Sequence, residues 1–193
     1  MVSGCRTRVI GNAHDPSREI VTGRGNLSFT SINMPRLAIN AKGNVGAFFD
    51  SLDEMMDLCI AQLMHRFRIQ ASKRVKNYPF LMGQGVWIDS DKPDINDEVG
   101  EVLKYGTLSV GFIGLADTLK SLIGKHHGES EEARELGIEI VTHMRKRIDE
   151  ETKRAGPIDP TRLFCIIILS PCGRLPLPAS LCRQRIPCRR APP

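Results

Sequence analysis

The sequence contains no apolar run of about 18 residues, the length that a membrane-spanning helix requires. Its first residues lack the order of charged, apolar and small residues that marks a signal peptide, and no segment repeats along the chain. We therefore expect a soluble, cytoplasmic protein with no membrane partner. With 193 residues, 41% of them hydrophobic, the chain is long enough for one domain with a substantial core.

Acidic residues are scarce near the C-terminus. Residues 155–193 hold six of the 27 lysines and arginines, but only one of the 22 acidic residues. The remainder of the chain therefore carries equal numbers of basic and acidic side chains, although the formal net charge is +5. Because the excess charge belongs to this terminal segment, we do not predict a nucleic-acid partner.

The segment 155–193 also differs from the rest in composition. It has no lysine, eight of the twelve prolines and four of the six cysteines, and these cysteines lack the paired C-x-x-C spacing of a zinc site. The apolar run 163–169 favours a strand, but the prolines beyond it leave little room for regular structure. We interpret 1–154 as one folded unit and 155–193 as a poorly ordered tail that is not native to it, through a frameshift, a misread gene end or a degraded terminus. A functional arginine-rich arm is the competing interpretation.

The first half of the chain predicts strands followed by a long helix. Residues 5–10 and 19–22 have an extended character and are joined by turn residues, which favours a hairpin. Residues 27–33 alternate as a strand does. After Asn44, a suitable N-cap, the apolar residues recur at steps of three and four, which predicts a long amphipathic helix. Its apolar positions are Val45, Phe48, Phe49, Leu52, Met55, Met56, Cys59, Leu63 and Phe67.

The second half alternates between helices and strands. The predicted elements are a loop or short strand over 80–87, a helix from Asn96 to Lys104 that ends at Gly106, a buried strand over 107–113, a helix over 115–123 closed by Gly124, and a last helix that begins at Ser130. The apolar stripe of the last helix is Ala133, Leu136, Ile140, Met144 and Ile148. This order predicts an α/β domain or a piece of a larger α/β barrel.

One cysteine lies in a setting that suits chemistry, in the stretch SGCRTRV. Arg6 and Arg8 follow Cys5 closely, and neighbouring cations favour the reactive thiolate form of a cysteine. Gly4 leaves the sulfur approachable. The alternative is a small buried thiol near a chain end, which is the commoner case.

Other chemically suggestive residues favour structural roles. Cys59 lies on the apolar stripe of the long helix and is expected in the core. Trp87 and Phe112 are expected to pack and not to stack on a ligand. The adjacent histidines 126–127 with Glu129 could suggest a metal, but no third ligand stands at a helical spacing, so we expect a loop contact and no metal site.

Five motifs carry a specific resemblance to a known family. They are GCRTRV, GRGNLSFTSINMPRLAI, YPFLMGQGVW, TLSVGFIGL and IGKHHGES, in this order over residues 4–153. On these motifs the chain resembles the anaerobic ribonucleoside-triphosphate reductases, which are glycyl-radical enzymes. The resemblance implies an α/β fold that is part of a ten-stranded α/β barrel with a finger loop through its centre, incomplete in this chain.

The resemblance also implies roles for two residues. Cys5, in the GCR motif, matches the cysteine at the tip of the finger loop, which carries the thiyl radical that removes the 3′ hydrogen of the ribose. Asn26, at the end of GRGN, matches the asparagine that hydrogen-bonds the ribose hydroxyls, and an amide offers both a donor and an acceptor for this task. By its spacing alone, Asn26 is equally a turn residue that tolerates a left-handed backbone.

The implied reaction is the anaerobic reduction of ribonucleoside triphosphates to 2′-deoxyribonucleoside triphosphates with formate as the reductant, which supplies deoxyribonucleotides for DNA replication. The family further implies a glycyl radical, a radical-SAM activating enzyme, a structural zinc, allosteric ATP or dATP, and a homodimer of the full-length enzyme. The motifs for the radical, the zinc and the ATP site do not occur in this sequence, so we expect an inactive fragment that binds none of these cofactors. The alternative is a non-catalytic truncated module that only associates with a partner.

Overall fold

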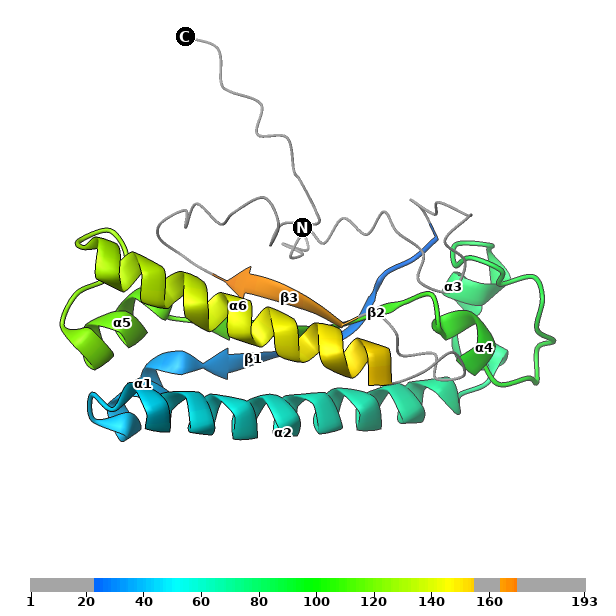
Figure 1. Ribbon diagram of the computed structural model, residues 1–193. Helices are drawn as coiled ribbons and strands as arrows, with labels where there is room; N and C mark the ends of the chain where they lie inside the picture. Colours follow the sequence, from blue (N-terminus) through cyan, green and yellow to red (C-terminus); the bar gives the residue numbers. More distant parts are fainter. Residues whose placement is uncertain (1–22, 155–163, 170–193) are drawn as a thin grey trace, which may run out of the picture.

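The computed structural model describes residues 23–154 and 164–169 (Figure 1). The hairpin predicted before residue 23, and Cys5 with it, lies outside these residues. The described elements are β1 (Asn26–Asn33), α1 (Met34–Ala41), α2 (Val45–Ala71), the 3₁₀ helix η1 (Val75–Asn77), α3 (Pro79–Gly83), α4 (Gly100–Leu103), β2 (Thr107–Ile113), α5 (Leu115–Ile123), α6 (Glu131–Arg154) and β3 (Phe164–Leu169). None of the described helices is long and apolar enough to cross a membrane.

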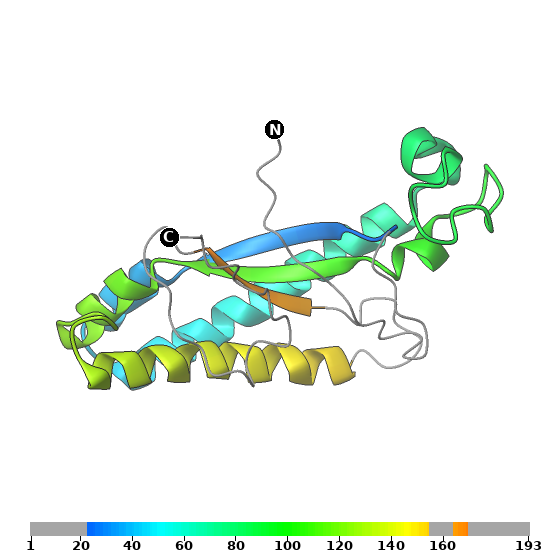
Figure 2. The same cartoon turned by 90° about the horizontal axis from the view of Figure 1, so that it is seen from above.

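Three parallel strands form one sheet in the order β1-β2-β3. The chain passes from β1 to β2 through α1 to α4, and from β2 to β3 through α5 and α6. The two long helices, α2 and α6, lie on the same face of the sheet (Figures 1 and 2). The predicted α/β class is therefore confirmed.

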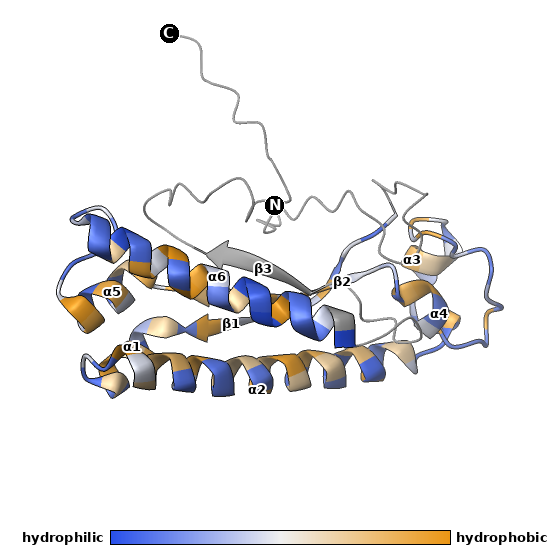
Figure 3. Ribbon diagram, viewed as in Figure 1, coloured by the Kyte–Doolittle hydropathy of each residue, from blue (hydrophilic) through white to orange (hydrophobic). Residues whose placement is uncertain are grey.

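Helix α2 begins and packs as its sequence predicts. Asn44 is the N-cap, and its Oδ1 accepts a hydrogen bond from the backbone N–H of Ala47 at 3.1 Å. Figure 3 shows hydrophobic and hydrophilic residues alternating along the helix, as an amphipathic helix requires. The buried stripe that holds α2 on the sheet consists of Phe48, Leu52, Met56, Cys59, Ile60, Leu63 and Phe67.

Helix α6 confirms the second predicted amphipathic pattern. Ser130 Oγ accepts a hydrogen bond from the backbone N–H of Ala133 at 3.2 Å, so the predicted N-cap is in place. All five residues of the predicted apolar stripe are buried. The helix is tied to α2 by a pair between His143 and Asp53, whose Nε2 and Oδ1 lie 2.7 Å apart.

Strand β2 is the buried centre of the sheet. Six of its seven residues are buried, as its apolar sequence predicts. A turn at Gly114, with a φ of 75°, leads from β2 directly into α5, and Gly124, with a φ of 79°, ends that helix as expected. Both positions lie in the left-handed region that favours glycine.

Three short elements differ from the sequence expectations. Helix α1 follows β1 without a loop and was not expected. Asn96 does not cap a helix that reaches Lys104, because α4 covers only four residues and its N-cap is Val99. Instead, Asn96 Oδ1 accepts a hydrogen bond from Lys76 Nζ at 3.3 Å. The segment 80–87 contains most of α3 and no strand.

The third strand comes from the segment 155–193. Residues 164–169 form β3 and pair in parallel with 108–113 of β2, which confirms the strand predicted from the apolar run. The division of the chain after residue 154 stays a prediction. The β3 pairing nevertheless shows that part of the proposed tail extends the sheet.

Candidate functional site

The sheet presents two different faces, one of which lies against the helices. Arg66 Nη1 of α2 donates to Ser28 Oγ at 3.2 Å, and Thr30 Oγ1 donates to Gln62 Oε1 of the same helix at 2.8 Å. Because side chains alternate along a strand, Phe29 faces the other side. We call that side the helix-free face, because neither of the two long described helices, α2 and α6, lies on it. Its members on the first two strands are Phe29, Ser31 and Asn33, with their register partners Ser109, Gly111 and Ile113.

A β-bulge places Asn26 on the helix-free face. Strict alternation would put Asn26 on the same side as Ser28. The register instead pairs Asn26 with Thr107 and Ser28 with Leu108, so one extra residue, Leu27, stands between the two pairs. Since Thr107 belongs to the helix-free face, Asn26 lies beside it there, and its side chain is exposed.

Backbone hydrogen bonds from two distant segments hold the turn that precedes Asn26. The carbonyl of Gly23 accepts a hydrogen bond from the N–H of Ile88 at 2.8 Å, and the carbonyl of Gly25 accepts one from the N–H of Thr107 at 2.9 Å. Gly23 has a φ of 71°, and an added β-carbon would lie 3.0 Å from the Ile88 nitrogen. A side chain at this position would therefore strain both the backbone and the contact.

Two side chains complete this anchoring. Arg24 Nε donates to the carbonyl of Tyr105 at 2.7 Å, and burial lowers the pKa of Arg24. Trp87 Nε1 donates to the carbonyl of Val102 at 2.7 Å, and its ring lies against Gly25, where an added β-carbon would be 3.5 Å away. Trp87 is 7% exposed, which confirms its predicted packing role. Three motifs that are distant in sequence thus meet around Asn26.

Two other candidates have the structural roles that the sequence predicts. Cys59 is 4% exposed within the core, and burial raises the pKa of its thiol, which disfavours the reactive thiolate. Phe112 of β2 is also buried in the core. Phe112 lies on the opposite side of β2 from Ser109 and Gly111, because side chains alternate along a strand. Cys59 belongs to α2, so neither residue lies on the helix-free face.

The adjacent histidines belong to the loop between α5 and α6. The backbone N–H of His126 donates to Glu129 Oε2 at 2.9 Å, and this bond is the main cause that lowers the pKa of Glu129. Burial, and then the neighbouring His126, lower the pKa of His127. The predicted loop contact is confirmed. Within the described ranges, no three histidine, cysteine, aspartate or glutamate side chains gather as they would around a metal ion.

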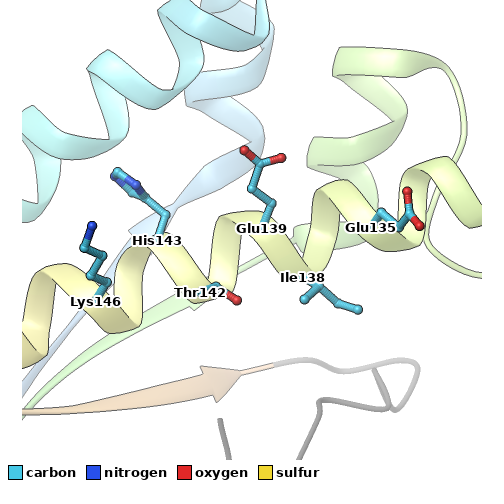
Figure 4. Close-up of a pocket in the computed structure, with 6 residues that line it drawn as sticks. All are labelled: Glu135, Ile138, Glu139, Thr142, His143 and Lys146. Carbon is cyan, nitrogen blue, oxygen red and sulfur yellow. The ribbon is translucent and has the colours of Figure 1, made fainter. Parts of the chain in front are cut away.

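A surface hollow of about 400 Å³ lies along α6 and does not include Asn26 (Figure 4). Figure 4 shows His143 pointing toward α2, where it pairs with Asp53. The described lining residues all come from this one helix: Glu135, Ile138, Glu139, Thr142, His143 and Lys146. Acidic and basic side chains share this helix surface, so we assign no ligand to the hollow.

Sequence reasoning missed the residues that orient Asn26. The bulge at Leu27 cannot be seen in the alternating pattern of 27–33, because a bulge depends on the partner strand. A possible signal was Gly106, directly before the buried strand, since an isolated glycine beside a strand indicates a bulge or a close backbone approach.

Comparison with known proteins decides the family. The family model described as anaerobic ribonucleoside-triphosphate reductase matches residues 1–157. The chain belongs to this family. It is 34% identical over 156 residues to the anaerobic ribonucleoside-triphosphate reductase of Salmonella typhimurium, with 79% of this chain and 22% of the relative covered.

Further relatives agree with this assignment. The Escherichia coli protein of the same name is 34% identical over 159 residues, which cover 79% of this chain and 22% of the relative. The protein of the same name from Enterobacteria phage T4 is 31% identical over 159 residues, again 79% of this chain and 24% of the relative. The chain therefore spans about a fifth to a quarter of the length of these curated reductases.

Proposed function

We propose that this chain forms a substrate-facing part of an enzyme that reduces ribonucleoside triphosphates to 2′-deoxyribonucleoside triphosphates without oxygen. The proposal rests on the family match over residues 1–157. This range includes Asn26 and the hydrogen-bonded turn before it, and the strand register supports a position of Asn26 on the helix-free face. In this proposal, the three parallel strands form one wall of a ten-stranded barrel. The helix-free face would then line the interior of the barrel, where the substrate binds.

Asn26 is the residue that we assign to the ribose. Its amide can donate to one hydroxyl and accept from another, which suits the two adjacent hydroxyls of a ribonucleotide. The side chain is exposed, while the carbonyls of its neighbours Gly25 and Leu27 accept hydrogen bonds from Thr107 and Gln70. An exposed amide on a fixed backbone can orient a ligand without losing much conformational freedom on binding.

Cys5 is the residue that we assign to hydrogen transfer, on the basis of the family resemblance. In the radical form, its sulfur takes the 3′ hydrogen atom of the ribose, so that an S–H bond forms, the C3′–H bond breaks, and the unpaired electron moves to C3′. An S–H bond is comparable in strength to this activated C–H bond, so the hydrogen can be returned after reduction. Formate supplies the reducing equivalents in this proposal.

Several cofactors and partners of the family belong to the complete enzyme. In the complete enzyme, a glycyl radical generated by a radical-SAM activating enzyme would supply the radical that Cys5 carries. Within residues 23–154 and 164–169 no cluster of potential metal ligands fits the structural zinc, and we derive no step through it. Allosteric ATP or dATP and the homodimer likewise belong to the proposed complete enzyme.

A graft tests the role of Cys5. Residues 1–154 replace the corresponding segment of a complete reductase of the family, and deoxynucleotide formed per activated radical is measured without oxygen. The graft should turn over, and Cys5→Ser should abolish turnover because an O–H bond is too strong for this hydrogen transfer. Cys59→Ser is the matched control, since it disturbs a buried packing position and should leave the radical chemistry in place. Turnover that persists in Cys5→Ser would contradict the assignment.

The same graft tests Asn26. The change Asn26→Ala removes hydrogen bonds to the ribose, each worth about 1–3 kcal/mol when one partner is left unpaired, so turnover should fall roughly ten- to a hundredfold. The exposed Asn44 provides the control, because Asn44→Ala removes the N-cap of α2, away from the helix-free face, and should lower stability without a comparable loss of turnover. Equal losses of turnover in the two variants would contradict a specific role for Asn26.

A further inference from the structure

The bulge in β1 rests on a glycine of the neighbouring strand. Gly106 directly precedes β2, and a β-carbon added to it would lie 2.6 Å from Leu27 Cδ1 and 2.9 Å from Leu27 Cδ2. Distances below 3.0 Å do not occur for real β-carbons, so Leu27 occupies the space that a side chain at position 106 would need. The extra residue of the bulge is therefore seated directly over Gly106.

The close approach of Leu27, and not the backbone conformation, explains why a glycine occupies position 106. Gly106 is absent from the described glycines with positive φ, so an alanine could adopt its backbone angles. Its N–H donates to the carbonyl of Leu103 at 2.8 Å, and it is buried. A glycine in a strand region without conformational need indicates that another chain segment comes close.

Leu27 is held in place from the other side as well. Its carbonyl accepts a hydrogen bond from Gln70 Nε2 of α2 at 3.2 Å, and its side chain packs against the core. Leu27 Cγ, which is bonded directly to Cβ, is also among the contacting atoms, so a turn of the side-chain tip alone does not relieve the clash. Leu27 has to turn its side chain out of the core or shift its backbone, which carries the bond from Gln70. A methyl group at Gly106 should displace the bulge itself.

We propose that Leu27 and Gly106 are positioning residues. The bulge at Leu27, packed against Gly106, places the side chain of Asn26 on the helix-free face beside Thr107. Without the bulge, alternation would turn Asn26 toward α2, on the side of Ser28. The inference rests on the proposed role of Asn26 at the ribose. β-bulges recur beside active sites because they re-aim a side chain in this way.

The grafted reductase provides the first test, with Gly106→Ala as the variant. A misplacement of about 1 Å in a reacting group can cost about a hundredfold in rate, so turnover should fall roughly ten- to a hundredfold. The matched control is Gly83→Ala, since a β-carbon there meets nothing within 4 Å, and its turnover should be unchanged. Where Asn26→Ala lowers turnover, unchanged turnover in Gly106→Ala would overturn the proposal.

A double-mutant cycle separates positioning from general damage. If Gly106 acts through Asn26, then Gly106→Ala should cost less than about twofold in a graft that already carries Asn26→Ala, because coupled residues are not additive. Adding Leu27→Ala to Gly106→Ala removes the branched side chain that clashes, and part of the lost turnover should return. Full additivity in the cycle would show a merely structural effect and overturn the proposal.

Crystal structures of the two glycine variants of the graft give a readout that does not depend on turnover. In the Gly106→Ala structure, Asn26 should no longer be the register partner of Thr107 in the sheet. In the Gly83→Ala structure, this register should be unchanged. If Asn26→Ala leaves turnover unchanged, the proposed role of Asn26 at the ribose fails, and these structures still decide the positioning. Asn26 paired with Thr107 in the Gly106→Ala structure would overturn the positioning inference alone.

Discussion

Ser109 carries a buried hydroxyl on the helix-free face of the sheet. It is 0% exposed, and its Oγ makes no hydrogen bond in the described part of the chain. Thr118 of α5 is equally buried, but its Oγ1 donates to the carbonyl of Gly114 at 2.8 Å. The two residues form a matched pair, because a buried polar group without a partner costs stability that a satisfied group does not.

We expect the two hydroxyls to respond differently to removal. Ser109→Ala should leave the free energy of unfolding unchanged or raise it by up to about 1 kcal/mol, whereas Thr118→Val should lower it by about 0.5–1.5 kcal/mol through the lost hydrogen bond. Chemical denaturation of the chain measures both. An equal loss in the two variants would show that Ser109 has a partner in solution.

At the residue scale, the sequence predicts what depends on neighbours along the chain. Asn44 and Ser130 are N-caps because their side chains bond to backbone N–H groups three residues ahead. Cys59 is buried because it continues a local apolar stripe. The face of Asn26 could not be predicted, because it depends on a register with Thr107, 81 residues away in the chain.

At the element scale, long periodic segments are predictable and short ones are not. Helices α2 and α6 repeat their apolar pattern over many turns, so the pattern predicts them well. Helices α3 and α4 have too few residues for a period. Their region is fixed by bonds between distant backbone groups, such as Val75 N–H to the carbonyl of Asp97 at 3.0 Å. Such pairings leave no local signal in the sequence.

The turn from β2 into α5 offers a test of packing between elements. Gly114 and Gly124, at the two ends of α5, have similar φ angles of 75° and 79°. A β-carbon at Gly114 would lie 2.8 Å from Pro35 Cδ of α1, whereas one at Gly124 would meet nothing within 4 Å. The two positions therefore share the same backbone strain and differ in their contacts.

We expect Gly124→Ala to cost about 1–2 kcal/mol of stability, the penalty of the left-handed conformation alone. Gly114→Ala should cost about 1–3 kcal/mol more, because the methyl group overpacks the contact between α1 and the start of α5. Thermal unfolding of both variants measures the difference. Equal midpoints would contradict tight packing of Pro35 on this turn.

At the scale of the whole molecule, the sequence predicts the class of the fold and the family, but not the extent of the sheet. Alternating strands and helices indicate an α/β fold, and the motifs indicate the reductase family. The composition of 155–193 separates it from the rest of the chain. That composition gives no sign that 164–169 pairs with β2, because strand pairing between distant segments follows from tertiary contacts.

The role of β3 can be decided by two truncations. Composition alone predicts that removal of 155–193 leaves the thermal midpoint unchanged. The structure predicts the opposite, because this removal takes away β3 and leaves one edge of β2 without its six paired residues. The net loss of even about 2 kcal/mol should lower the midpoint by about 4–8 °C for a chain of this size. A chain that ends at Leu169 keeps β3 and should hold the higher midpoint, so equal midpoints for the two truncations would place 164–169 outside the cooperative fold.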